Sequence, residues 1–339
     1  MMASVRVADV RDALRAEDVI NTYGLRVRKT GAKYRLNLCP GCGASSSSWA
    51  IEINPRRRTW GHFGHGKNEG GTCFGDLIDL VAACEGLSRR SQWPRVLDRA
   101  AAIAGVSASI TDDERARRAR ERVDRERRLA AEDARADQER RVRAAVEWRS
   151  LDRGNLAGEL YLAGRGLDPV PLVGAGHVLF SAVGDVCVRL HDLRDGELVT
   201  VHRRRIAPPD PSRKCHTPAG GTTRGTLCGR IQEIVGDTVV TEGVADTLTA
   251  IQLWPRTTVI GAAGAGQLRA VAEAAAPIVR ARGGRLWIVR HDEDVGVRCA
   301  ADAAIAARDA GLVVGRDLLL VDIDPHNDLN DAHRAGWRP

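Results

Sequence analysis

Apolar and polar positions change their period several times along the chain, and each change predicts a structural element. Apolar residues recur at helical spacing from Asp9 to Tyr23. YRLNLCPGCG then predicts a short strand that enters a cysteine turn, and WAIEINPRRRTWGHFGHG alternates around an Asn-Pro turn, as in a strand pair. Asp76 can cap the next helix. The apolar positions of that helix are Leu77, Ile78, Leu80, Val81 and Leu87.

A charged stretch interrupts these patterns after Val106. Residues 111–150 contain thirteen arginines and eleven acidic residues, with alanines between them and almost no bulky apolar side chain. Such a sequence predicts a solvated helical linker with many pairs of opposite charge. A nucleic-acid-binding arm is the alternative, but the acids nearly cancel the arginines.

Short strands and turns follow between about Leu151 and Val235, in HVLFSA, DVCVRLHDL and ELVTVHRRRIA. From there strand and helix alternate regularly. The predicted strands are DTVVTEG, TTVIGAAG, RLWIVRHDED and DLLLVDID, with helices between them. This rhythm predicts right-handed crossovers and a mostly parallel sheet covered by helices, with chemistry at the carboxyl ends of the strands.

Length and charge limit the classes of protein that fit. A chain of 339 residues is long enough for two or three domains. The formal charge is +7 and nearly all cations are arginine, which suits a phosphate-bearing partner, although a GC-rich genome would also favour arginine. Because no stretch approaches the roughly 20 apolar residues of a membrane span and the N-terminus lacks the apolar core of a signal peptide, we expect a cytoplasmic protein.

Two cysteines and two histidines share a spacing typical of metal knuckles. Cys39 and Cys42 are separated by two residues, as are His62 and His65, and a glycine follows each pair. Two such knuckles facing each other supply the four ligands of a structural zinc ion. Either histidine alone would more simply be a surface residue. Cys73 is a rival fourth ligand, because the inserted KNEGGT loop can return it to the site.

Carboxylates follow three of the predicted strands. Glu242 ends the first, Asp292 and Asp294 follow the third, and Asp328 follows the fourth with Asn330 and Asp331. Any one of these acids, or Asp246, can be a helix cap. Three acidic strand ends in one sheet would repel one another unless divalent cations lay between them, and Mg2+ fits such a site.

The N-terminal motifs resemble the zinc-binding domain of bacterial and phage DNA primases. The resemblance rests on CPGCG, a strand pair, a second knuckle with Phe63-Gly64 and Gly66, and then GDLIDLV. That family has cysteines in its second knuckle, whereas this chain has histidine at both positions and extra residues before Gly75.

The acidic strand ends resemble the TOPRIM catalytic domain of the same primases. The resemblance implies metal binding by Glu242, Asp292 and Asp294, with Asp328 completing the site and Mg2+ or Mn2+ as the catalytic ion. The family usually leaves two residues between the second Asp of Asp-x-Asp and the next glycine, but only Val295 separates Asp294 from Gly296. An ungapped match would place His291 and Glu293 in the metal positions. The preference for the aspartates rests on chemistry, since oxygen ligands suit Mg2+ better than imidazole does.

The middle segment resembles the region that precedes TOPRIM in primases of phages and mobile elements. It carries cations that could neutralise the charge of a template or a triphosphate, namely Arg203, Arg204, Arg205, Arg213 and Lys214. In the zinc domain, Trp60 or Phe63 could stack on a base of single-stranded template or could equally pack the knuckle.

The resemblance implies a multi-domain α/β primase of the mobile-element or prophage type. Its expected parts are a zinc-binding domain (1–106), a charged helical linker (107–150), a basic α+β part of the catalytic core (151–235) and a TOPRIM domain (236–339). Such a protein would make short RNA primers on single-stranded DNA from ribonucleoside triphosphates by two-metal nucleotidyl transfer during DNA replication. Because the sequence contains no G-x4-G-K-[ST] loop, a helicase would act in trans.

Two other functions fit the same motifs. A TOPRIM nuclease would use the same metals, and a non-catalytic zinc-dependent DNA-binding replication protein would use only the N-terminal part. A topoisomerase fits poorly, because it needs a nucleophilic tyrosine on a further large domain and the only tyrosines are Tyr23, Tyr34 and Tyr161.

Overall fold

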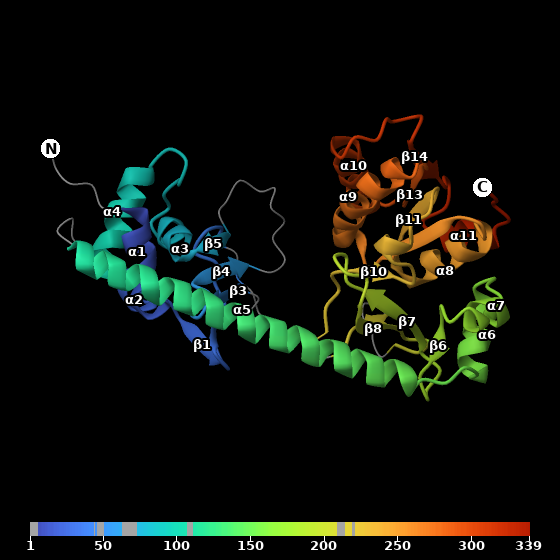
Figure 1. Ribbon diagram of the computed structural model, residues 1–339, viewed down its shortest axis with the longest axis horizontal. Helices are drawn as coiled ribbons and strands as arrows, with labels where there is room; N and C mark the ends of the chain where they lie inside the picture. Colours follow the sequence, from blue (N-terminus) through green and yellow to red (C-terminus); the bar gives the residue numbers. More distant parts are fainter. Residues whose placement is uncertain are drawn as a thin grey trace. The chain divides into compact units, whose positions relative to one another are not determined.

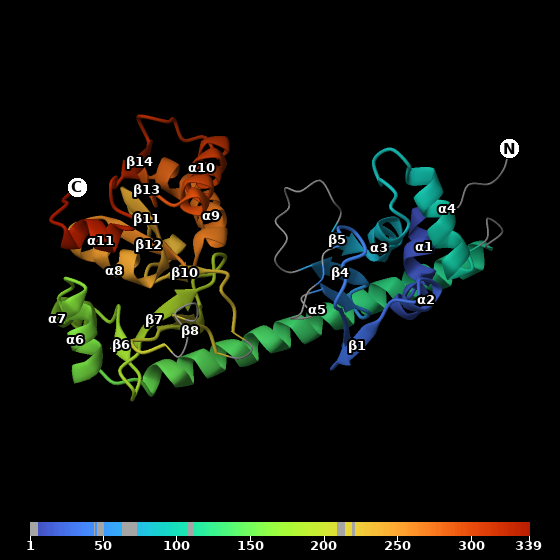
Figure 2. The ribbon, with the colours of Figure 1, turned by 180° about the vertical axis from the view of Figure 1, so that it is seen from behind.

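The chain folds into two compact units, Met1–Asp133 and Ala134–Pro339. The computed structural model describes residues 6–43, 45, 51–62, 73–106, 111–208, 214–218 and 221–339. Figures 1 and 2 show each unit from two sides. The boundaries between the four expected parts stay predictions.

The first unit is a small antiparallel sheet packed against short helices. Its strands follow one another in the order β1-β2-β3-β4-β5. They are β1 (Val27–Thr30), β2 (Lys33–Leu36), β3 (Ile51–Asn54), β4 (Thr59–His62) and β5 (Phe74–Asp76). The helices are α1 (Val7–Ala13), α2 (Ala16–Thr22), α3 (Leu77–Cys84) and α4 (Trp93–Ala104). The core joins Ile51, Ile53 and Trp60 of the sheet to Leu80 and Val81 of α3.

The predicted strand pair and the helix that follows it are both confirmed. Strands β3 and β4 are antiparallel, with Ile53 opposite Trp60 on either side of the Asn-Pro turn. Asp76 caps α3, because its carboxylate accepts hydrogen bonds from the backbone N–H groups of Ile78 and Asp79, both at 3.0 Å.

The single helix expected from Asp9 to Tyr23 is instead two helices. Leu14 has extended backbone angles (φ −63°, ψ 123°) and ends α1, and α2 begins at Ala16. Leu14 and Ala16 are each only 1 % exposed. Since residues two apart on one continuous helix point in different directions, the break allows both side chains to enter the same core.

The predicted charged linker is one helix, α5 (Asp112–Arg149), of 38 residues. Pairs of opposite charge lie along it, including Arg118 with Glu114 at 2.8 Å and Arg135 with Glu139 at 3.2 Å. Its first part also pairs with the body of the first unit. There, Arg122 of α5 lies 2.7 Å from the carboxylate of Asp12, which is only 7 % exposed. The segment therefore combines solvated ion pairs with a specific contact.

The second unit is built on a nine-stranded sheet, ordered β14-β13-β11-β12-β10-β7-β8-β9 with β6 beside β7. The parallel strands are β11 (Thr238–Glu242), β12 (Thr258–Ala262), β13 (Leu286–Arg290) and β14 (Leu318–Asp322). The antiparallel strands are β6 (Leu179–Phe180), β7 (Val186–His191), β8 (Leu198–Arg204), β9 (Cys215–His216) and β10 (Thr226–Leu227). Because β10 pairs with both β12 and β7, the middle segment and the parallel strands share one sheet.

Helices cover both faces of the parallel strands, as the alternating pattern predicted. On one face, Val240, Ile260 and Ile288 pack against α9 (Ala265–Ala281) and α10 (Asp294–Asp309). The residues adjacent to these along the three strands, Val239, Val259 and Val289, belong to a separate core with α8 (Gly243–Leu253) and α11 (Leu329–Arg334). Successive strand residues point to opposite faces, so both faces of this sheet are apolar. The short helices α6 (Leu156–Gly164), α7 (Pro169–Gly174) and the 3-10 turn Ile231–Glu233 complete the described elements of this unit.

The order of the parallel strands locates the place where chemistry is expected. Strand β11 lies between β12 and β13. The chain therefore goes from β11 to β12 on one side, and then crosses back over β11 to reach β13 on the other side. Such a switch in direction opens a crevice at the carboxyl ends of the strands. Glu242 ends β11 and His291 follows β13 at this edge. Within the described part of the chain, no helix is both long and apolar enough to cross a membrane.

Candidate functional site

The first candidate site is a group of cysteine and histidine side chains in the N-terminal unit. The ligand atoms of Cys39, Cys42 and His62 all lie within 4.8 Å of one another. Cys39 and Cys42 share a tight turn, closed by a hydrogen bond from the Gly43 N–H to the Cys39 carbonyl at 2.9 Å, with Gly43 at a positive φ of 69°. His62 ends β4. The pairing of strands therefore brings His62, from the second knuckle, next to Cys39 and Cys42 of the first knuckle.

Cys73 also lies at this group. Its Sγ is 3.8 Å from Sγ of Cys39, and its carbonyl accepts a hydrogen bond from the His62 N–H at 2.8 Å. Burial raises the pKa of the Cys39 thiol and raises that of Cys73 to about 12. Since a bound zinc ion holds cysteine as thiolate, these buried sulfurs fit a cation that would deprotonate them.

Two sequence candidates near this group differ in where they lie. His65 and Phe63 fall outside the described residues. Trp60 is 4 % exposed and belongs to the core of the sheet, which is the packing role that the sequence left open. The indole ring therefore has no free face for a nucleic-acid base.

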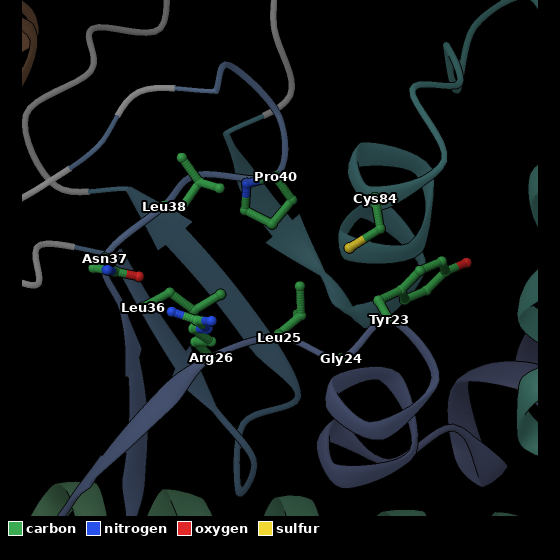
Figure 3. A pocket seen from close by; sticks show the side chains of 9 residues that line it. All are labelled: Tyr23, Gly24, Leu25, Arg26, Leu36, Asn37, Leu38, Pro40 and Cys84. Carbon is green, nitrogen blue, oxygen red and sulfur yellow. The ribbon is translucent and has the colours of Figure 1, made fainter.

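A pocket of about 420 Å³ lies beside the cysteine turn. Figure 3 shows Leu38 and Pro40 on one side of it and Cys84 and Tyr23 on the other. Leu38 is 55 % exposed, so this apolar wall of the pocket is open to solvent. Arg26 and Asn37 also line the pocket, so charged and amide groups border its apolar surface.

The second candidate site lies at the switch point of the large sheet and begins with Glu242. The chain passes from β11 into α8 through Gly243, whose φ is 76°. Burial raises the pKa of the Glu242 carboxyl group, while His291 and a hydrogen bond from the backbone of Ala265 oppose that rise. Ala265 begins α9, so the glycine-rich turn before it serves to present a backbone N–H to this carboxylate.

His291 connects Glu242 to a second, deeper carboxylate. Its Nε2 is 2.5 Å from Oδ2 of Asp246, and its Nδ1 is 3.8 Å from Oε2 of Glu242. Asp246 is 2 % exposed. Burial lowers the pKa of His291, but the hydrogen bond to Asp246 and the charges of both carboxylates outweigh it and raise the pKa to about 8. The imidazole is therefore held between two acids.

Asn330 supports the same arrangement from the last helix. Its backbone N–H donates to Oδ1 of Asp246 at 3.1 Å, and its side-chain amide donates to the Arg165 carbonyl at 2.9 Å and to Thr249 at 3.0 Å. It is completely buried. Asp328, predicted for the same site, caps α11, and its charge acts on both Asp246 and His291. Asp331, in the first turn of α11, donates its backbone N–H to that cap at 2.7 Å, and its carboxylate lies 3.7 Å from the Arg334 guanidinium.

The two aspartates of the predicted Asp-x-Asp motif lie farther out. Asp292 and Asp294 are exposed, and Asp294 begins α10. Among the charged side chains that shift the pKa of Glu242, His291 has the largest effect, followed by Asp246 and Glu293. The assignment of Asp292 and Asp294 as metal ligands stays a prediction. The ungapped match to the family pattern gave His291 as the alternative to the aspartates, and Asp246 was expected only as a possible helix cap.

The basic residues of the middle segment are partly used inside the fold. Arg203 donates to Glu147 at 2.9 Å, and Arg204 donates to the Tyr161 hydroxyl at 3.1 Å. The backbone of Arg205 bonds to that of Lys214 at 2.8 Å, and Lys214 is exposed. Arg213 lies outside the described residues. A role for these five cations in binding nucleic acid stays a prediction.

Comparison with known proteins places the second site in a domain family. Residues 237–337 match the Toprim domain. The search of curated proteins found no match to this chain.

Several solved primase structures are similar to the chain. The primase fragment of the bacteriophage T7 primase-helicase protein is 20 % identical over 52 % of this chain and 69 % of its own, with a TM-score of 0.40. The Aquifex aeolicus primase, with its zinc-binding and RNA polymerase domains, is 18 % identical over 97 % of this chain and 81 % of its own, with a TM-score of 0.41. A Pseudomonas aeruginosa DNA primase domain is 15 % identical over 57 % and 73 %, with a TM-score of 0.38.

The family match covers β11 to α11 and includes every acidic residue of the second site. The expected TOPRIM resemblance is thereby confirmed, and the chain carries a Toprim domain over residues 237–337.

Proposed function

We propose that this protein is a DNA primase that synthesises short RNA primers on single-stranded DNA. The proposal rests on the presence of two features in one chain. Glu242 ends strand β11 of a Toprim domain, and a separate unit holds a group of cysteine and histidine side chains. A Toprim domain alone is also compatible with other enzymes of phosphodiester chemistry. The zinc-type group is the feature that favours template-directed synthesis.

The residues of the second site have distinct roles in this proposal. Glu242 supplies a carboxylate at the strand end, and Asp328 and the acids of the loop after β13, among them Asp292 and Asp294, add negative charge around it. Asp246 and Asn330 are positioning residues, because they hold the loop and α11 against α8. When bound, divalent cations would neutralise the triphosphate and activate the attacking 3' hydroxyl.

The oxygen donors at this edge fit a divalent cation. The Glu242 and Asp246 side chains are 22 % and 3 % exposed, so water solvates their negative charges poorly and burial raises both pKa values. A cation beside them would relieve that cost. The exposed acids of the loop remain accessible to an ion that also keeps water and phosphate oxygens as ligands.

The N-terminal unit would bind the template strand. A zinc ion at Cys39, Cys42 and His62, with Cys73 or His65 as fourth ligand, would hold the cysteine turn in place. The adjacent pocket has apolar walls for a base, and Arg26 with the exposed Arg28 and Lys29 on β1 offers charge for the backbone. A helicase partner acting in trans is part of the same proposal.

A primer-synthesis assay tests the proposal. Single-stranded DNA and ribonucleotides would be incubated with wild-type protein and with Glu242→Ala and Asp292→Ala, in Mg2+ and separately in Mn2+. We expect labelled oligoribonucleotides from wild type and at least a hundredfold loss in Glu242→Ala. Asp302→Ala is the matched control, since Asp302 is an exposed acid farther along α10.

Other outcomes distinguish the alternative functions. If wild type cleaves the DNA and Glu242→Ala does not, the protein is a Toprim nuclease and the primase proposal is wrong. Template binding with neither activity in either metal would leave a non-catalytic DNA-binding protein. One observation favours the non-catalytic DNA-binding protein: His291 lies between Glu242 and Asp246, where the expected metal site would have only carboxylates.

A further inference from the structure

The loop after β13 places an imidazole where an all-oxygen metal site would have a carboxylate. Of the side chains that follow β13, His291 is the one that contacts Glu242 and Asp246 directly, at 3.8 Å and 2.5 Å. Both of its ring nitrogens face a carboxylate. Its side chain is 17 % exposed, so the ring is enclosed but can still be reached from the crevice.

Gly296 shows that this placement is built into the backbone. A Cβ atom at position 296 would lie 2.5 Å from Cβ of His291, closer than two such carbons can approach. The start of α10 can therefore pack against His291 only because residue 296 is glycine. His291, Glu293 and Gly296 have the spacing that the Toprim resemblance assigns to the two metal-binding acids and their glycine. The charge of Glu293 is also felt at Glu242, where it raises the pKa.

Asp246 orients the imidazole for ligation. It binds His291 through Oδ2 and is itself fixed through Oδ1 by the Asn330 N–H. When the imidazole is neutral, a carboxylate that accepts the proton of one ring nitrogen sets the tautomer and leaves the other nitrogen with a free lone pair. Here the nitrogen that remains is Nδ1, on the side of Glu242. Carboxylate, imidazole and metal ion in a row is a recurrent arrangement at protein metal sites.

The distance between Nδ1 and the carboxylate suits two ligands of one ion. First-row metal ions hold nitrogen and oxygen at roughly 2.0 to 2.2 Å, so two ligands of one ion are at most about 4.4 Å apart. The observed 3.8 Å is within that limit. Imidazole suits first-row transition ions such as Zn2+ and Fe2+, whereas Mg2+ takes oxygen ligands. Mn2+ is the transition ion that shares with Mg2+ a preference for carboxylate oxygens, so it suits a site with both kinds of ligand.

We infer that His291 Nδ1 and Glu242 ligate one divalent cation, and that the nitrogen ligand makes this site select a transition ion such as Mn2+ over Mg2+. The inference rests on the proposed function only in placing a cation at the Toprim site. It identifies His291 as a residue that determines metal specificity, and Asp246 as the residue that positions it. The exposed Asp292 then contributes at most an outer interaction.

Electron paramagnetic resonance of bound Mn2+ tests the inference without an activity measurement. Zinc-saturated full-length protein would be titrated with Mn2+ at pH 8.5, where the imidazole is largely neutral, and Mg2+ would then be added as competitor. We expect the bound ion to show coupling to a 14N nucleus. We also expect His291→Asp to abolish that coupling and to reduce the preference for Mn2+ over Mg2+ by at least tenfold.

Control variants separate the site from other histidines and from misfolding. His326→Asn alters a histidine of the loop after β14 and should retain the coupling. His291→Asn keeps a polar, uncharged side chain and should lose it while the protein remains folded by circular dichroism. Glu242→Gln should weaken Mn2+ binding itself.

The outcomes for this inference and for the primase proposal are distinguishable. Mn2+ bound with no nitrogen coupling, or an unchanged metal preference in His291→Asp, would overturn the inference and leave primer synthesis possible. Nitrogen coupling in a protein that makes no primers would support the metal site and overturn the primase. Failure of wild type to bind Mn2+ more tightly than Glu242→Gln would also overturn the inference.

Discussion

The backbone N–H of Asn330 donates a hydrogen bond to Oδ1 of Asp246 at 3.1 Å, across 84 residues of sequence. Both residues are buried, and the other carboxylate oxygen of Asp246 contacts His291. The contact ties the last helix to the first helix of the Toprim domain. It also fixes the carboxylate that His291 contacts.

Replacing Asn330 should destabilise the second unit. Asn330→Ala removes three hydrogen bonds of a fully buried amide and leaves the Arg165 carbonyl and Thr249 without that donor. We expect a loss of about 2 kcal/mol in the free energy of unfolding, measured by urea denaturation. Asn327→Ala changes an exposed asparagine three residues earlier and should stay within about 0.5 kcal/mol of wild type. Equal stability of the two variants would contradict the role of Asn330.

The stability of the second unit should fall as pH rises from about 6.5 to above 8. The folded protein holds the His291 proton more tightly than the unfolded chain, because the pKa is raised from 6.5 to about 8. The contribution is therefore complete below pH 6.5 and lost above pH 8, and it is on the order of 1 to 2 kcal/mol. Urea unfolding without added Mg2+ or Mn2+ would measure it.

His291→Gln is the matched variant for this pH dependence. Its stability should change less than that of wild type between pH 6.5 and 8.5. His191 and His202 are also buried, but burial lowers their pKa values to about 4, so their effects fall at lower pH. Parallel pH profiles of wild type and His291→Gln would exclude His291 as the source.

Bound zinc should depend on Cys73. Since its sulfur lies 3.8 Å from that of Cys39, we expect Cys73→Ala to lose zinc, as Cys39→Ala and Cys42→Ala should. His65→Ala should then retain it. The measurement is zinc content per chain by inductively coupled plasma mass spectrometry. Cys84→Ala, a change at a cysteine of the neighbouring helix, serves as control and should keep one zinc ion.

The opposite result for the zinc content of these variants would identify His65, rather than Cys73, as the fourth ligand. If His65→Ala loses zinc and Cys73→Ala keeps it, the two knuckles form the Cys2His2 site that their spacing first indicated. Removal of zinc by a chelator should in either case unfold the cysteine turn and reduce binding of single-stranded DNA.

Binding of single-stranded DNA should depend on the pocket beside the cysteine turn. Leu38→Asp places a charge on an apolar wall, and Arg26→Glu reverses a charge at its rim. We expect each to weaken binding by roughly fivefold to tenfold, or about 1 kcal/mol, in fluorescence anisotropy with a labelled oligonucleotide. Leu156→Asp changes a leucine that is 72 % exposed in the other unit and should have little effect. Unchanged affinity in both pocket variants would move the template site elsewhere.

Local patterns predicted most of the secondary structure. The parallel strands, their covering helices, the hairpin around Asn54 and Pro55 and the Asp76 cap all follow from spacing and from the chemistry of single residues. The break at Leu14 does not, because its cause is the shared core that Leu14 and Ala16 enter. The continuity of the middle segment with the parallel strands also depends on a distant pairing, that of β10 with β12.

The sequence by itself determined which residues could do chemistry in this protein: the cysteines and histidines of the knuckles, and the acids that follow parallel strands. Only the tertiary structure decided which of them meet. Trp60 is buried because β4 lies inside the sheet, and Cys73 reaches Cys39 because β5 pairs with β4. The imidazole of His291 lies 3.8 Å from Glu242, and Gly296 leaves room for α10 to begin beside it. Spacing specifies a residue's neighbours along the chain, but packing across strands determines which side chains share a site.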